Sequence, residues 1–206
     1  ADLLGEHAPH RLAAVGGRPD HHVQHLAETL HLDGRLIQRA LEQLAAAAGA
    51  TVALEFLPFS AVNSIGAAQA FIRAAELCNT RLLVDSWHFF QGPSTWEQLC
   101  GLWPQEIAYL QFADHAAIGV DNPLHATVNE RLLPGEGAFD LARFCAQLRE
   151  TGFDGALSCE VLSSTWRGRA PAEYARAEFA ASRRYWGRDR DQPGRQLLPA
   201  PASETN

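Results

Sequence analysis

The stretch LLVDSWHFFQG, residues 82–92, starts as an apolar strand and runs into polar groups. Three apolar residues lead directly to Asp85, and His88 follows three positions later. A short apolar run of this kind is typical of a strand that is covered on both faces of a parallel sheet. In parallel α/β folds, ligands gather at the carboxyl ends of the strands, which is where Asp85 stands. The stretch therefore predicts a parallel sheet with a functional site at one edge.

The rest of the chain alternates between strand-like and helix-like segments. We expect strands at residues 11–17, 51–56, 81–87, 106–114 and 155–161. Apolar residues recur at helical spacing, often before a terminating glycine or proline, over residues 33–48, 64–77, 94–103, 140–152 and 170–186. This alternation indicates β/α units around a parallel sheet. Residues 188–206 show no periodicity, and we expect a disordered C-terminal tail there.

The composition of the 206 residues is that of a globular protein, with 47% hydrophobic and 20% charged residues. The net charge of −7, with arginine as the only strongly basic residue type, argues against a nucleic-acid partner. No apolar run approaches the roughly 20 residues that span a membrane. The cysteines form no C-x-x-C pair, which favours a reduced, cytoplasmic protein. We expect these thiols to be small core residues: Cys78, Cys100, Cys145 and Cys159.

Each of the four later strands carries an oxygen-bearing side chain near its carboxyl end. These side chains are Glu55, Asp85, Gln111 and Glu160. Three carboxylates brought together repel one another, and a divalent cation that coordinates them offsets the repulsion. Carboxylate and amide oxygens suit Mn²⁺ or Mg²⁺ better than Zn²⁺ or Co²⁺. The pattern therefore predicts one divalent ion at this edge of the sheet.

Less specific roles compete with this interpretation. A single acidic residue at a strand end is usually an N-cap or a solvated loop residue, but four matched positions in succession argue against that for the set. His88 is either a proton donor or hydrogen-bonding group that faces a substrate, or a structural histidine. Further histidines near the start show no clear metal-ligand spacing, and we interpret them as solvated surface: His7, His10, His21, His22, His25 and His31.

The stretch NERLLPGEG, residues 129–137, lies in a long loop between the last two strands. Gly135 and Gly137 allow tight backbone turns. Arg131 either holds a carboxylate or phosphate of a substrate, or belongs to a structural turn that leads into the helix at residue 140. Asn63 likewise either contacts substrate or caps the helix that begins at residue 64.

Five stretches together resemble the second half of a xylose-isomerase-like TIM barrel, in the superfamily of sugar-phosphate isomerases and epimerases. They are VALEFLPFSAVNS, LLVDSWHFFQG, YLQFADH, ERLLPGEGAFDL and GFDGALSCEVLSS. The resemblance implies a metal held by Glu55, Asp85, Gln111 and Glu160, with His88 on a substrate-contacting histidine. Many epimerases of the family carry His where this chain has Gln111. Hydroxypyruvate isomerase and some 3-dehydroshikimate dehydratases carry Gln there.

Such a site implies proton chemistry on a small sugar, sugar phosphate or hydroxy-keto acid. An ion bound by adjacent carbonyl and hydroxyl oxygens acidifies the carbon between them, and a nearby base removes the proton to give a metal-stabilised enediolate. Glu55, Glu160 and His88 are the candidate catalytic groups. Reprotonation gives isomerisation or epimerisation, which we favour. Loss of a β-hydroxyl gives dehydration of the 3-dehydroshikimate or inosose type.

The length of the chain adds a further expectation. An eight-stranded barrel usually needs about 250 residues, and the expected strands correspond to numbers four to eight. The sequence also contains no Met. We therefore interpret residues 1–187 as a partial barrel domain, whose exposed sheet edge favours a homo-oligomer or instability. An inactive fragment or a metal-binding scaffold is the alternative to an enzyme.

Overall fold

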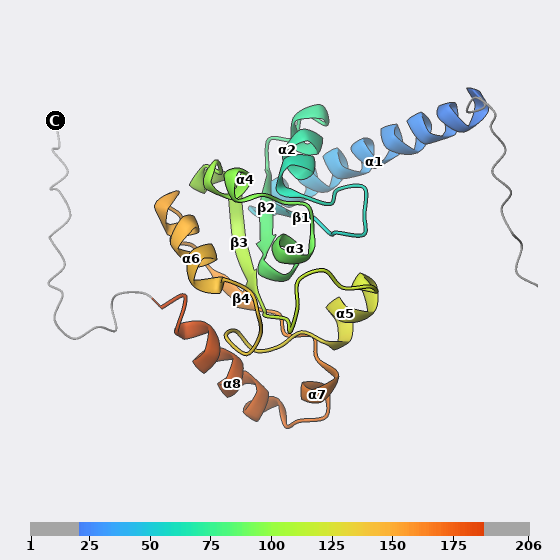
Figure 1. The fold of residues 1–206 in the computed structure, drawn as a ribbon. Helices are drawn as coiled ribbons and strands as arrows, with labels where there is room; N and C mark the ends of the chain where they lie inside the picture. The colour runs from blue at the N-terminus through green and yellow to red at the C-terminus, as the bar shows by residue number, and fades with distance from the viewer. Residues whose placement is uncertain (1–20, 188–206) are drawn as a thin grey trace, which may run out of the picture.

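The structure, a computed structural model, describes residues 21–187. At its centre lies a sheet of four parallel strands in the order β1-β2-β3-β4. The strands are β1 Val52–Glu55, β2 Thr80–Asp85, β3 Ile107–Phe112 and β4 Leu157–Cys159. Neighbours in the sheet are also neighbours in the sequence, so the chain forms successive β/α units, as predicted (Figure 1).

Helices precede, connect and follow these strands. The long helix α1, His21–Ala47, projects away from the rest of the fold in Figure 1. The other helices are α2 Ile65–Ala74, α3 Ser86–Gln91, α4 Trp96–Cys100, the 3₁₀ helix η1 Pro104–Glu106, α5 Pro123–Asn129, α6 Leu141–Glu150, α7 Ser164–Arg167 and α8 Pro171–Arg183. Two of these helices begin at a side-chain cap. The side chain of Ser64 accepts a hydrogen bond from Ala67 N, and that of Asp140 accepts one from Arg143 N.

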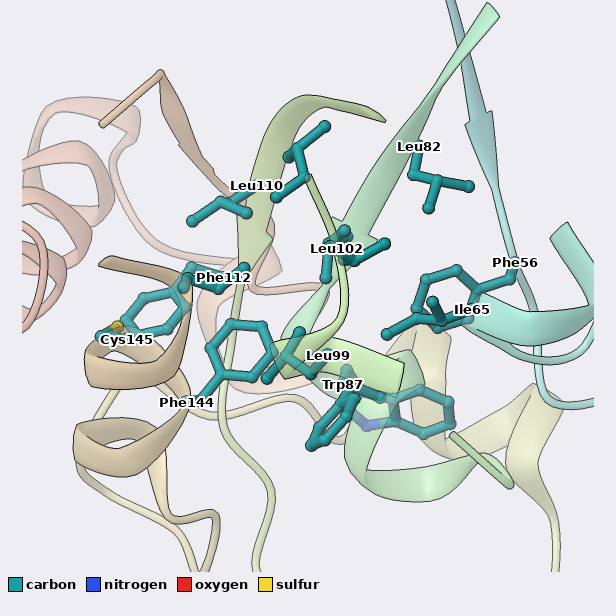
Figure 2. Close-up of a cluster of buried hydrophobic side chains, with 14 of the residues drawn as sticks. Phe56, Ile65, Leu82, Trp87, Leu99, Leu102, Leu110, Phe112, Phe144 and Cys145 are labelled. Atoms are coloured by element: carbon teal, nitrogen blue, oxygen red, sulfur yellow. The ribbon is translucent and has the colours of Figure 1, made fainter. Parts of the chain in front are cut away.

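One face of the sheet packs against helices α2, α4 and α6. The buried cluster joins strand side chains to helix side chains (Figure 2), and its members include Leu82, Val84, Leu110, Phe112, Ile65, Leu99, Phe144 and Leu148. Because side chains alternate along a strand, the residues between these strand positions face the opposite side of the sheet. Asp85 and Gln111 are two of those residues.

The opposite face of the sheet is only partly covered within the described residues. Arg81 and Ser158 are exposed on it, and Tyr109 is half-buried. In a closed barrel this face lines the interior, so the four described strands form an open sheet. Helix α1 also exposes a row of apolar side chains, which are Leu36, Ile37, Leu41 and Leu44.

Several boundaries differ from the prediction. Helix α1 begins at His21 rather than at residue 33, because the histidine-rich stretch before residue 33 has no clear apolar periodicity. Strand β2 stops at Asp85, two residues early, since the Asp85 side chain accepts a hydrogen bond from Trp87 N and caps α3. Helices α5 and α7 are too short to show a period. The predicted strand at 11–17 and the tail at 188–206 lie outside the described residues.

None of the helices within residues 21–187 combines the length and the apolar composition that crossing a membrane requires.

The cysteines differ in their environments. Cys145 lies in the core, as predicted for the thiols, and burial raises its pKa to about 12. Cys78 and Cys100 are exposed, which contradicts that prediction, and Cys159 is half-buried. Cys78 lies in the segment between α2 and β2, and Cys100 is the last residue of α4.

We predict that a maleimide at pH 8 labels Cys78 and Cys100 rapidly and leaves Cys145 unlabelled. A thiol whose pKa is raised stays protonated below that pKa, and it is the thiolate that reacts. Intact mass measured over time gives the number of labelled thiols. Labelling in denaturant, where all four thiols react, is the control. Rapid labelling of Cys145, located by peptide mapping, would contradict the buried placement of α6.

Candidate functional site

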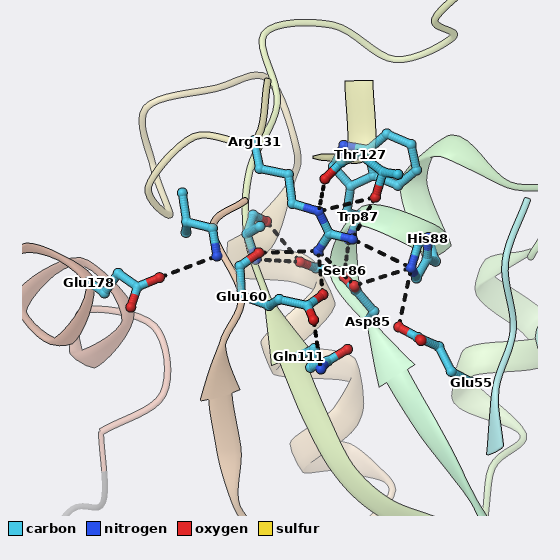
Figure 3. A network of polar contacts seen from close by, with 12 residues as sticks. Glu55, Asp85, Ser86, Trp87, His88, Gln111, Thr127, Arg131, Glu160 and Glu178 are labelled. Atoms are coloured by element: carbon cyan, nitrogen blue, oxygen red, sulfur yellow. Dashed lines mark hydrogen bonds and ion pairs between the residues drawn. The ribbon is translucent and has the colours of Figure 1, made fainter. Parts of the chain in front are cut away.

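The four predicted strand-end side chains lie at one edge of the sheet. Asp85 ends β2 and pairs in register with Gln111 of β3. Glu55 ends β1 and pairs with Leu83, two residues before Asp85. Glu160 directly follows β4. Because alternate residues of a strand share a face, the sheet brings all four side chains to the same side (Figure 3).

Arg131 stands at the centre of this set, and its side chain is 1% exposed. Its Nη1 donates to Asp85 Oδ2 at 2.8 Å and contacts Glu160 Oε2 at 3.1 Å. Thr127, one turn earlier in the chain, accepts from Nε through its carbonyl oxygen at 2.9 Å and from Nη2 through its hydroxyl at 2.7 Å. The ring of Trp87 lies 5.3 Å from the guanidinium carbon. The guanidinium is therefore held on several sides.

The relation between Asp85 and His88 follows from helix α3. Asp85 caps this helix, so His88 lies one turn further along, on the same side as the carboxylate. His88 Nε2 is 3.5 Å from Asp85 Oδ2 and 3.2 Å from Glu55 Oε1. The imidazole is almost fully buried, whereas the Glu55 side chain is 32% exposed. His88, placed by the D-x-x-H spacing, thus connects the buried carboxylate of Asp85 to the partly exposed carboxylate of Glu55.

Gln111 and Glu160 form the other side of the site. Gln111 Nε2 donates to Glu160 Oε1 at 3.2 Å. Gln111 Oε1 is buried and accepts no hydrogen bond from the described residues, and neither does His88 Nδ1 have a partner there. Buried polar atoms without a partner are uncommon in folded proteins. Both atoms are therefore free to meet a ligand.

The electrostatics of this edge affect two side chains. Burial raises the pKa of the Glu160 carboxyl above its usual value, and the nearby Arg131 guanidinium partly opposes that rise. Burial, followed by the Glu55 and Glu160 carboxylates, also raises the pKa of Tyr109. A raised pKa makes the Glu160 carboxylate a stronger base, which suits proton abstraction from carbon.

The residues present fit a divalent cation. Ligand atoms of Glu55, Asp85 and His88 lie within 4.8 Å of one another, a group that includes the histidine but not Glu160. Gln111 adds a free amide oxygen. Asp85 and Glu160 contact the guanidinium of Arg131, whereas Glu55 contacts His88, so the set holds three carboxylates and one guanidinium. Arg131 Nη1 bridges Asp85 and Glu160, however, and an ion that used both carboxylates would compete with it.

Asp114 lies two residues after the end of strand β3 and organises the loop that carries Arg131. Its buried carboxylate accepts four backbone hydrogen bonds, and the donors are the N–H groups of His115, Gly135, Gly137 and Phe139. Its backbone also pairs with Leu132, the residue after Arg131. Gly135 has φ +89°, and a Cβ on Gly137 would collide with the Asp114 carboxylate. Gly137 is therefore required by the Asp114 carboxylate, and Gly135 by its own backbone conformation.

The other predicted site residues have mixed placements. Arg131 lies within the carboxylate set, in a buried ion pair with Asp85. Asn63 does not cap α2, because Ser64 does. Within residues 21–187, no hydrogen bond or ion pair joins Asn63 to the other site residues, so its contact with substrate stays a prediction.

Three residues of the site carry no strong sequence signal. Thr127, Asp114 and Tyr109 are common residue types, and their roles depend on contacts with distant parts of the chain. For Asp114 a sequence signal does exist, because the backbone N–H groups of a later G-x-G loop can donate hydrogen bonds to a carboxylate that follows a strand.

Comparisons with known proteins identify the family of the chain. A family model described as xylose isomerase-like TIM barrel matches residues 7–185, and the chain belongs to this family. The predicted barrel-type α/β fold is thereby confirmed. The crystal structure of the IolI protein with a bound zinc atom is similar to this structure, with a TM-score of 0.68 and 23% identity over 78% of this chain and 59% of that one.

Two relatives with assigned activities are enzymes. The 3-dehydroshikimate dehydratase of Pseudomonas aeruginosa is 32% identical over 130 residues, which are 63% of this chain and 20% of the enzyme. The inosose isomerase of Bacillus subtilis is 32% identical over 124 residues, which are 59% of this chain and 43% of the enzyme. The chain thus spans less than half the length of each of these relatives.

We predict that Asp114→Asn lowers the free energy of unfolding by about 3 kcal/mol, because the amide group cannot accept all four N–H donors and buried unpaired donors cost about 1–3 kcal/mol each. Urea unfolding followed by circular dichroism measures the change. Asp154→Asn, at an exposed position, is the matched control and should change stability by less than about 0.5 kcal/mol. Equal stability of the two variants would mean that Asp114 does not hold the loop.

Proposed function

We propose that this member of the xylose isomerase-like TIM barrel family is a divalent-metal-dependent isomerase or epimerase of a small hydroxylated ketone. The observation that carries the proposal is the convergence of Glu55, Asp85, Gln111 and Glu160 at one sheet edge, beside His88 and Arg131. Glu55, Asp85, Gln111 and Glu160 would hold Mn²⁺ or Mg²⁺. When bound, the ion would polarise adjacent carbonyl and hydroxyl oxygens and acidify the carbon between them.

The three carboxylates are suited to different tasks. Asp85 is fully buried and both of its oxygens accept hydrogen bonds, so it is an anchor. Glu55 and Glu160 are 32% and 30% exposed, and they come from the two outer strands of the sheet. A substrate carbon between them would face a carboxylate on each side. Two bases on opposite sides are what removal of a proton and its return require.

His88 is the proton-transfer partner of Glu55 in this proposal. Its Nε2 lies within reach of Glu55 Oε1, so a proton taken up by Glu55 can pass to the imidazole. The unpartnered His88 Nδ1 leaves the second ring nitrogen available for a substrate hydroxyl. Arg131 and Asn63 are the proposed groups for binding substrate oxygens.

The substrate class follows from the relatives. The names of the two relatives refer to inosose and to 3-dehydroshikimate. Both compounds are six-membered rings with a ketone next to a hydroxyl group. A cyclic hydroxyketone is therefore the proposed substrate. The dehydratase relative supports a second candidate, a metal-dependent dehydratase, because loss of a β-hydroxyl begins with the same proton abstraction.

We predict that a calorimetric titration with Mn²⁺ finds one site in the wild-type chain. Glu160→Ala should weaken binding by on the order of 100-fold, because it removes a direct ligand. Glu97→Gln, at an exposed position on α4, should bind as the wild type does. His88→Gln should also retain binding, since the proposal makes His88 a proton-transfer group.

Two outcomes would contradict this assignment. Loss of binding in His88→Gln would make the histidine a ligand and would favour Zn²⁺, which prefers imidazole. No binding by the wild type would mean that the carboxylates serve the ion pair with Arg131 alone.

We predict that the metal-loaded chain interconverts inosose isomers without a rise in ultraviolet absorbance. Dehydration of a cyclic hydroxyketone creates a conjugated chromophore, whereas isomerisation and epimerisation do not. Chromatography of the products identifies the isomer, and His88→Gln should lower the rate by about 10²–10⁴-fold. A rise in absorbance with inosose or 3-dehydroshikimate would replace the isomerase with the dehydratase.

A further inference from the structure

The buried ion pair of Arg131 occupies two of the carboxylates that the proposed metal needs. Asp85 is fully buried, and its Oδ2 accepts from Arg131 Nη1 while its Oδ1 accepts from Trp87 N. Glu160 Oε2 contacts the same Nη1. An ion that reaches Asp85 and Glu160 therefore meets oxygens whose charge a guanidinium already neutralises.

We propose that Arg131 is the resident cation of the metal-free site and competes with the divalent ion for Asp85 and Glu160. The inference rests on the proposed metal site and adds what controls its affinity. In the absence of an ion, the guanidinium stabilises carboxylates that would otherwise repel one another within a buried site. When an ion binds Asp85 Oδ2, its charge and that of the guanidinium repel each other across this oxygen, so the contact with Nη1 opposes binding of the ion.

Thr127 is the positioning residue for this competition. Its hydroxyl accepts from both Nε and Nη2 of Arg131, at 3.2 and 2.7 Å, and its carbonyl oxygen accepts from Nε at 2.9 Å. The carbonyl oxygen of Glu160 accepts from Nη1 at 3.2 Å. These bonds orient the planar group so that Nη1 faces the carboxylates, and they make its displacement more costly.

The competition can be measured without any catalytic assay. Arg131→Met removes the competing cation and keeps much of the apolar length of the side chain. Arg81→Met is the matched control, because it removes the same charge from an exposed position on the Asp85 face of β2, four residues from Asp85. Any general gain in cation affinity from a more negative chain is shared by the two variants.

We expect Arg131→Met to bind Mn²⁺ at least about 10-fold more tightly than Arg81→Met does, because the ion no longer displaces a charge-assisted hydrogen bond. Without the ion, Arg131→Met should melt at a lower temperature than the control, and saturating Mn²⁺ should raise its melting temperature by more. Calorimetry gives the affinity, and thermal unfolding with and without Mn²⁺ gives the shift.

Thr127→Val keeps the positive charge of Arg131 in place and removes only the hydroxyl that orients its guanidinium. This variant should bind Mn²⁺ about threefold more tightly than the wild type, because the lost hydroxyl hydrogen bonds no longer restrain the guanidinium. It keeps the inference testable if Arg131→Met does not fold. The exposed Thr165→Val is its control and should leave the affinity unchanged.

The outcomes separate this inference from the metal site itself. Equal or weaker Mn²⁺ binding by Arg131→Met and Thr127→Val, with binding by the wild type intact, would overturn the competition and leave the proposed metal site standing. No Mn²⁺ binding by the wild type or by either variant would overturn both.

Discussion

The buried contact between Arg131 and Asp85 is the constraint on which the site depends. Both side chains are withdrawn from water, which costs free energy that only close, well-oriented partners repay. Thr127, Glu160 and the Trp87 ring supply those partners. Loss of one member of such a pair typically costs about 3–5 kcal/mol, because the other charge stays buried and unpaired. Replacement of either residue alone is therefore expected to destabilise the fold.

The fold holds this contact through short-range features on either side of it. Asp85 is placed by β2 and held by the start of α3, where Ser86 exchanges hydrogen bonds with both backbone groups of Ala113 at the end of β3. Arg131 is placed by the loop that Asp114 organises through four backbone N–H groups. One stretch of chain, residues 113–114, thus anchors the segments that carry both charges, and the ion pair closes between them.

The sequence predicts the carboxylate edge well and the arginine poorly. Glu55, Asp85, Gln111 and Glu160 could be placed because parallel strands end at the same edge and alternate residues share a face. The role of Arg131 could not, since it depends on contacts 46 residues apart that no local pattern encodes. A substrate contact and a structural turn are the two expectations for Arg131, and neither includes its buried ion pair with Asp85. The start of α1 was missed for a different reason, because helical propensity without an apolar stripe leaves no period to detect.

The polar network of the site and the enclosure of a substrate require different parts of a barrel. The polar network joins consecutive β/α units and forms within the described residues even though the sheet is open, with Gln111 Oε1 and His88 Nδ1 as its unpartnered atoms. The proposed substrate needs more, because a hydroxylated ketone would have to be enclosed before water is excluded from the carbon that loses a proton. Arg81 and Ser158 remain exposed on the face that a closed barrel would cover. Metal binding should therefore depend on the described strands alone, whereas turnover also depends on whatever covers that face.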